Sequence, residues 1–286
     1  CMFGLAQCPP REKHRPTNEN KRALDIPGEF GFDRCMCCFS RNVEEVKNTR
    51  IFARLGENGN QVLIYSMHMS AREEVAMVLP IPVKEGTSES EVRFFDFSGY
   101  ADVFSDLHQC FPIERARFSG ARAVPEGTER ATLKVVSVGA FDASFVPSIA
   151  DFTRLDERFR LPEGVWSKLP GYASFGFAVF KLKKGRHDVH PMAFSFPTAK
   201  EGSVFFPTLH IHDGEVHDQE HFDHTLYLQG QRLRMSSDWK ESPGLAVQRV
   251  KCGLTHGMIR PELHLYRRTI RGNFTNGDIV VKRSLF

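Results

Sequence analysis

Short apolar runs recur along the chain and predict a fold made mainly of strands. The clearest runs are residues 61–69 (QVLIYSMHM) and 75–83 (VAMVLPIPV), and the pattern returns at 132–141, 174–185 and 188–199. Gly, Pro and Asn-Gly signals separate the runs, as expected between strands. Further strands are expected near the C-terminal end, at 245–250, 262–270 and 278–283.

Two segments have the periodicity of a helix instead. In residues 99–111 the apolar positions recur at i, i+3, i+4 and i+7, Ser98 can cap the first turn, and Pro112 closes the last one. Residues 148–158 repeat the pattern more weakly. About two helices among roughly ten strands predict an α+β fold that is mainly antiparallel β and sandwich-like.

The chain divides into an arm and a domain. Residues 1–31 are polar and broken by prolines, which predicts an extended N-terminal arm that needs a partner surface to become ordered. Residues 32–286 are expected to form a single β-rich domain. Because 174–199 repeats the order of apolar runs seen in 61–83, this domain could consist of two similar β units, about 32–130 and 131–286.

Composition and charge narrow the class of protein. The 25 phenylalanines favour packed sheets, and the net charge of +3 is too small to indicate a nucleic-acid partner. The charge is uneven, however: residues 201–230 hold six acidic and no basic residues, whereas the chain from 231 onward holds eleven basic and four acidic ones. The first segment should attract cations, and the second is either a phosphate-facing surface or an ordinary solvated face.

The cysteines argue for a reducing compartment. There are seven, an odd number, and most cluster at the N-terminal end without the regular spacing of a disulfide framework. We therefore expect a soluble cytoplasmic protein, and no apolar run approaches the ~20 residues that span a membrane. The C-x-x-C spacing of residues 35–38 fits a zinc site, a redox pair or buried thiols, and Cys1 could act as an N-terminal nucleophile with its own α-amine as base.

A histidine-rich run, residues 205–226, carries the strongest chemical signal. If Asp213-Gly214 forms a two-residue turn, it joins strands 205–212 and 215–217 in a tight hairpin. Opposed residues of such a pair project to the same side, with Cβ atoms about 5 Å apart. The residues that would share this face are His210, His212, Glu215 and His217.

Three imidazoles and a carboxylate suit a divalent transition metal such as Zn, Mn, Fe, Ni or Cu. If 218–227 is helical, His221 and His224 share a face, and with Asp223 they are alternative ligands or partners that orient the ligating rings. The competing interpretation is a hairpin whose histidines simply hydrogen-bond to nearby carboxylates.

Two resemblances accompany these patterns. The His210-x-His212 and Glu215 spacing resembles the metal-binding hairpin of cupins, though with two residues before the glutamate rather than three or four. The run from CCFSRNVEEVKNTRIFAR through QVLIYSM to VAMVLPIPV is similar to the opening of uncharacterised bacterial β-rich proteins, which implies a fold tendency and no activity.

Three hypotheses follow for the function. The first is a metal-binding β protein, with an open coordination position for water or substrate. The second is a hydrolase that uses Cys1 as nucleophile. The third is a non-enzymatic interaction protein whose N-terminal arm or basic C-terminal part contacts a protein partner.

Overall fold

A computed structural model describes residues 38–56, 58–111, 141–162, 164–211, 214–231 and 235–282. The predicted arm at 1–31 and the nucleophile Cys1 lie outside these residues. Within them, strands dominate, which confirms the α+β and mainly antiparallel β fold predicted from the apolar pattern. None of the described helices is long and apolar enough to cross a membrane.

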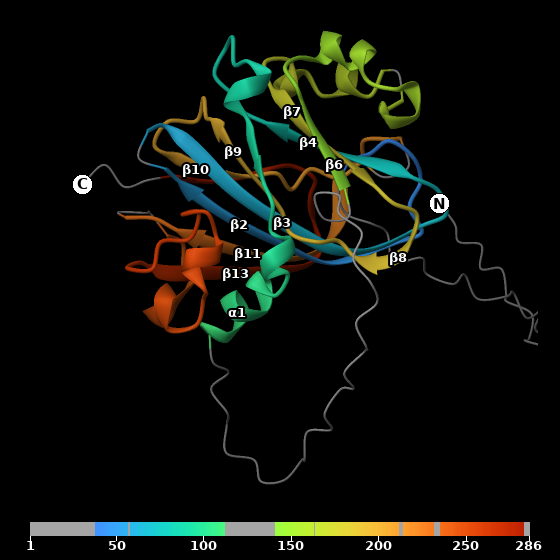
Figure 1. Ribbon diagram of the computed structural model, residues 1–286. Helices are drawn as coiled ribbons and strands as arrows, with labels where there is room; N and C mark the ends of the chain where they lie inside the picture. Colours follow the sequence, from blue (N-terminus) through green and yellow to red (C-terminus); the bar gives the residue numbers. More distant parts are fainter. Residues whose placement is uncertain are drawn as a thin grey trace, which may run out of the picture. The chain divides into compact units, whose positions relative to one another are not determined.

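The larger sheet has the strand order β12-β13-β11-β2-β3-β9-β5, and β8 pairs with β3 off this path. The long strands β2, β3, β11 and β13 lie next to one another at its centre (Figure 1). All pairs are antiparallel except β11 with β2, which run parallel. The bounds are β2 (Glu45–Leu55), β3 (Asn60–Ala71), β5 (Arg93–Phe95), β8 (Gly185–Asp188), β9 (Met192–Pro197), β11 (Gln219–Gln229), β12 (Lys240–Leu245) and β13 (His264–Thr275).

Two smaller sheets complete the strand structure. One has the order β1-β4-β7-β6, and the other pairs β10 with β14. Their bounds are β1 (Cys38–Phe39), β4 (Val75–Ile81), β6 (Phe141–Val146), β7 (Gly176–Leu182), β10 (Ser203–Phe206) and β14 (Ile279–Lys282). One core unites all three sheets, since Tyr65 of β3, Phe180 of β7 and Phe206 of β10 belong to the same buried cluster.

A second core lies on the other face of the larger sheet, where α1 (Val103–Gln109) packs. Val103, Phe104 and Leu107 of this helix are buried with Tyr227 of β11, as their i, i+1, i+4 spacing requires. The helix predicted at 99–111 is therefore present, and a 3₁₀ turn, η2 (Ser98–Tyr100), precedes it.

The weaker helix predicted at 148–158 consists of two 3₁₀ segments, η3 (Ile149–Arg154) and η4 (Glu157–Phe159). Leu155 between them is extended, with ψ of 153°, and the Asp156 side chain accepts a hydrogen bond from the backbone N–H of Arg158. This local capping bond starts a new turn and interrupts a continuous helix. The remaining 3₁₀ segments are η1 (Glu89–Glu91), η5 (Trp166–Lys168), η6 (Pro170–Tyr172), η7 (Ala246–Gln248) and η8 (Cys252–Leu254).

The first two apolar runs form β3 and β4, and the runs proposed as their repeats form β7 and β9. They pair across the sequence, β3 with β9 and β4 with β7. Pro80 lies inside β4, opposite Phe177, so it does not end the strand. The proposed duplication of the domain stays a prediction, because strand pairing alone does not test it.

Candidate functional site

The histidine-rich run does not form the predicted hairpin. Strand β10 ends at Phe206, β11 begins at Gln219, and of the described residues between them only Ile211 pairs, in a parallel bridge with Cys38. The edge of β10 pairs instead with β14. A sequence that favours a tight turn, Asp213-Gly214, is therefore not enough to form a hairpin here. Strand β14 pairs with β10 instead, and side chains from elsewhere in the chain hydrogen-bond to the backbone of the histidine-rich run.

Asn276 is one of these side chains. It lies in the turn between β13 and β14, and its Oδ1 accepts a hydrogen bond from the His210 backbone N–H at 2.8 Å. Its Nδ2 donates to the carbonyl oxygens of His210 at 2.9 Å and His217 at 3.0 Å. One amide side chain thus fixes the run at two points, as a pairing strand would.

Asp278, in the same turn, holds the residues before His210. Its Oδ1 accepts from the backbone N–H groups of Thr208 at 2.8 Å and Leu209 at 3.0 Å, and its Oδ2 accepts from the Tyr172 hydroxyl at 2.7 Å. The residue as a whole is half-buried, but its carboxyl group is enclosed, and burial raises the pKa of Asp278 to about 6 against the lowering effect of these hydrogen bonds. Burial also raises the pKa of Tyr172.

Held in this way, His210 turns its ring into the core, where it is 1% exposed. The ring lies 4.3 Å from the Phe222 ring and 5.3 Å from the His224 ring, centroid to centroid, and is tilted only 11° from the latter. Both partners come from β11, whose alternation puts Phe222 and His224 on its inner face. Two imidazoles that are fourteen positions apart in the sequence therefore meet in the interior.

The surroundings of His224 are unusual for a polar side chain. It is 1% exposed, and neither ring nitrogen has a hydrogen-bond partner among the described residues. Its parallel partner on β2 is Thr49, which is fully buried and whose Oγ1 also has no such partner. Burial lowers the pKa of His224 to about 3, so the ring is neutral at physiological pH.

The other predicted ligands lie elsewhere. Glu215 is exposed and forms an ion pair with Lys168, so its carboxylate faces away from the buried rings. His217 is half-buried, and His212 lies outside the described residues. The three predicted ligands that the structure describes, His210, Glu215 and His217, therefore do not share the hairpin face that the sequence predicted. Among the described residues, no group of three or more His, Cys, Asp or Glu side chains is arranged to hold a metal ion.

The residues proposed as alternative ligands separate as well, because 218–227 is strand rather than helix. In a strand, positions i and i+3 point to opposite faces. His221 is accordingly exposed, with Nδ1 3.1 Å from Oδ1 of Asn273, whereas His224 is buried. Asp223 accepts a hydrogen bond from the Asn48 backbone N–H and pairs with Arg271.

The cysteines offer no described reactive site. Cys38 is buried, and its thiol donates to the Leu209 carbonyl at 3.7 Å, while the rest of the 35–38 cluster lies outside the described residues. Burial raises the pKa of the Cys110 thiol to about 11, and that of Cys252 is raised too. Thiols with raised pKa values are weak nucleophiles at neutral pH.

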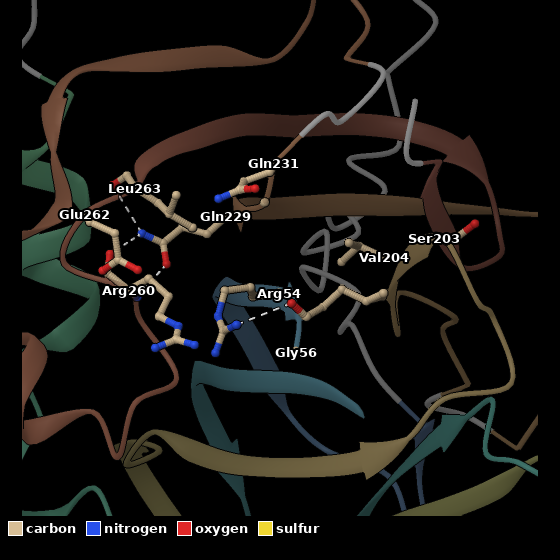
Figure 2. Close-up of a pocket in the computed structure, with 12 residues that line it drawn as sticks. Arg54, Gly56, Ser203, Val204, Gln229, Gln231, Arg260, Glu262 and Leu263 are labelled. Carbon is tan, nitrogen blue, oxygen red and sulfur yellow. Dashed lines mark hydrogen bonds between the residues drawn. The ribbon is translucent and has the colours of Figure 1, made fainter. Parts of the chain in front are cut away.

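A separate pocket of about 310 Å³ opens where the parallel strands β2 and β11 both end. Figure 2 shows Arg54, Gln229, Arg260 and Glu262 around it. Arg54 is the last-but-one residue of β2, and the parallel register places it opposite Gln229. Three glycines, Gly56, Gly202 and Gly230, also line the pocket and leave its wall without side chains at those points.

Sequence reasoning did not find this pocket, because no local pattern indicates that β2 and β11, whose paired residues are 175 positions apart, pair in parallel. The one available signal was the excess of basic residues from 231 onward, which includes Arg260. The pairing of His210 with His224 was missed for a different reason. The two rings meet only because residues 219–229 form a strand, whereas the spacing of the polar residues in 218–227 suggests a helix.

Comparison with known proteins gives distant structural neighbours only. No family model matches the chain, and no curated protein matches it. The crystal structure of baculovirus P35 superimposes with a TM-score of 0.44 at 12% identity, covering 85% of this chain and 97% of that chain. The crystal structure of the caspase-8/P35 complex matches with a TM-score of 0.41 at 12% identity, covering 83% and 96%. At these scores the likeness carries no argument about function, and the cupin-like and bacterial resemblances stay predictions.

Proposed function

We propose that this protein binds a divalent transition metal ion through the buried imidazoles of His210 and His224. The environment of His224 carries the proposal, since both its ring nitrogens are enclosed with no hydrogen-bond partner among the described residues. A buried polar group left unpaired costs about 1–3 kcal/mol, and native proteins rarely leave one so. A metal ion coordinated by one nitrogen would remove part of that cost.

The spacing of the two rings supports a shared ion. A Zn–N bond of about 2.0–2.1 Å places each ring centroid about 3.2 Å from the metal, so two ligands at a tetrahedral angle have centroids about 5 Å apart. The observed centroid distance is 5.3 Å. Because the ring planes are only 11° apart, one ring must turn about its side-chain bonds before both in-plane nitrogen lone pairs point at one ion. The neutral state of His224 also favours binding, because only a deprotonated ring nitrogen can coordinate.

Burial points to the role of the ion. Both rings are 1% exposed, so a metal between them would be shielded from substrate and would act mainly by stabilising the fold. A structural zinc ion has four ligands, so two further donors would have to come from beyond the groups that the described residues bring together. Imidazole ligands suit Zn, Cu, Fe and Ni better than they suit Mn. Glu215 takes no part in this revised site, and His212 lies outside the described residues.

The test is elemental analysis of the purified protein together with its thermal unfolding. We expect about one metal ion per chain, and a lower Tm after removal of the ion with a chelator, because a ligand that binds only the folded state stabilises it. His224→Phe fills the site with an apolar ring and should abolish metal binding. The matched control is His221→Phe, since His221 lies on the outer face of the same strand.

Two results would overturn the proposal. One is the absence of stoichiometric metal from wild-type protein even after incubation with zinc. The other is metal that is retained equally by the His224→Phe and His221→Phe variants, provided both keep the wild-type circular dichroism spectrum.

A protein-binding role is the second candidate, and the open edge of β14 favours it. This strand pairs only with β10 among the described strands, and Val280 on it is 43% exposed. Phe274 of β13, six positions earlier in the chain, is 45% exposed. An unpaired edge with exposed apolar residues can add a strand from a partner protein. P35 has been crystallised with caspase-8, which supplies a defined first partner for a binding assay. A complex that Val280→Lys weakens and Asp142→Lys leaves unchanged would support this edge.

The hydrolase hypothesis rests on Cys1, which lies outside the described residues, and it gains no support. It stays a prediction.

A further inference from the structure

The pocket at the ends of β2 and β11 is lined by two arginines and one acidic residue. Arg54 and Arg260 contribute two positive charges and Glu262 one negative charge, so the charged residues in the described part of the wall sum to +1. In the view of Figure 2 the guanidinium groups of both arginines point towards the same part of the pocket. Guanidinium groups match the geometry of carboxylate and phosphate oxygens.

The guanidinium of Arg54 is fixed before any ligand arrives. The side chain is 93% buried, since the residue is only 7% exposed. Its Nε donates to the Met258 carbonyl at 2.7 Å, Nη2 to Gly257 at 2.9 Å and Nη1 to Leu55 at 3.3 Å. A group already held in one orientation loses little entropy when it binds a ligand.

Arg260 is fixed through its backbone. The side chain of Gln229 is completely buried, and its Oε1 accepts from the Arg260 N–H at 2.8 Å. Its Nε2 donates to the Arg260 carbonyl at 2.9 Å. The side-chain amide of Gln229 therefore bonds to both backbone groups of Arg260, as a neighbouring strand would. These two bonds place Arg260 opposite the end of β2.

The size and walls of the pocket indicate a small ligand. Its volume of about 310 Å³ is at the lower end of the range for small-molecule sites, and the glycines on its wall let a ligand approach the backbone. Ser203 adds a hydroxyl group to the wall. We propose that this pocket binds a small molecule through a phosphate or carboxylate group held between Arg54 and Arg260.

Isothermal titration calorimetry of the full chain tests this, with inorganic phosphate and acetate as separate probes at constant ionic strength in chloride. We expect at least one of the two to bind, and the one that binds identifies the oxyanion. Arg260→Gln should weaken that binding about tenfold or more, because a hydrogen bond to a charged group contributes about 1.5–3 kcal/mol. Arg249→Gln, which removes the same charge from an exposed position outside this pocket, should leave the affinity unchanged within about twofold.

Ser203→Asp provides a second variant that does not depend on the folding of an arginine mutant. It adds a negative charge to the wall and should abolish binding of either anion. The proposal is overturned if neither anion binds more tightly than chloride. It is also overturned if Arg249→Gln weakens binding as much as Arg260→Gln does, since the effect would then come from overall charge. Chelation of metal should not change any of these results, which separates this site from the His210–His224 pair.

Discussion

Asp278→Asn should change the pH dependence of stability by an amount that can be worked out from the structure. The carboxyl group of Asp278 is enclosed, and its pKa is about 6 in the folded protein against an ordinary value of 3.8. Between these values the folded state keeps a proton that the unfolded state has lost. Stability from this group is therefore greatest at low pH and falls as the pH rises through 6, and the total cost of ionisation is about 3 kcal/mol.

The assay is urea unfolding of wild type and Asp278→Asn at pH 5 and pH 7.5. Between these values the wild type should lose about 1.4 kcal/mol through Asp278, and the variant, which cannot ionise there, should lose none of it. The free energy of unfolding of the variant minus that of wild type should therefore rise by about 1.4 kcal/mol. Asparagine keeps an oxygen that can accept from Thr208 and Leu209, so the turn should keep its shape.

Other titrating groups cancel in this difference if they are distant from the substitution. Asp142→Asn, on an exposed position of β6, is the control and should show no such change. A difference that is equal at the two pH values, or that falls towards pH 7.5, would refute the reasoning, because it would mean that the carboxyl group is solvated or is stabilised in its charged form.

Further predictions concern the turn, the core and the proposed metal. Asn276→Ala should lower the free energy of unfolding by about 2–4 kcal/mol in urea, because it removes three hydrogen bonds to enclosed backbone groups. Gly176→Ala should cost about 1–3 kcal/mol by thermal unfolding, since a Cβ there would lie 2.5 Å from a β6 phenylalanine ring; Gly99→Ala, with open space around it, should cost less. A chelator should lower the Tm of wild type and leave that of His224→Phe unchanged.

Much of the fold was predictable from local patterns. The apolar runs at 61–69 and 75–83 are strands because nearly all their side chains are buried between or within sheets, and a continuous apolar run signals burial on both faces. The helix near 103–109 was predictable because one face packs on the larger sheet. In each case the signal and its structural cause lie in the same ten residues.

The candidate site was harder to predict from the sequence, because the residues that form it are distant from one another along the chain. Asp213-Gly214 is a good turn sequence, but the run around it is held by Asn276 and Asp278, which no local pattern connects to it. The sequence singled out His210 as a first-choice ligand and placed its neighbour in space, His224, only among the alternative ligands. The pocket at Arg54 depends on a parallel pairing of strands, and sequence periodicity contains no information about which strands pair.

The turn at residues 276–278 also sets when the site can form during synthesis. The bonds from Asn276 and Asp278 to the histidine run join residues 59 to 70 positions apart. A ribosome that has completed His210 must still add 66 residues, several seconds of translation, before Asn276 exists and can bond to His210. Until then His210 has no fixed inward orientation. A nascent chain should consequently acquire the histidine pair late, after the β3–β4 region has had time to collapse.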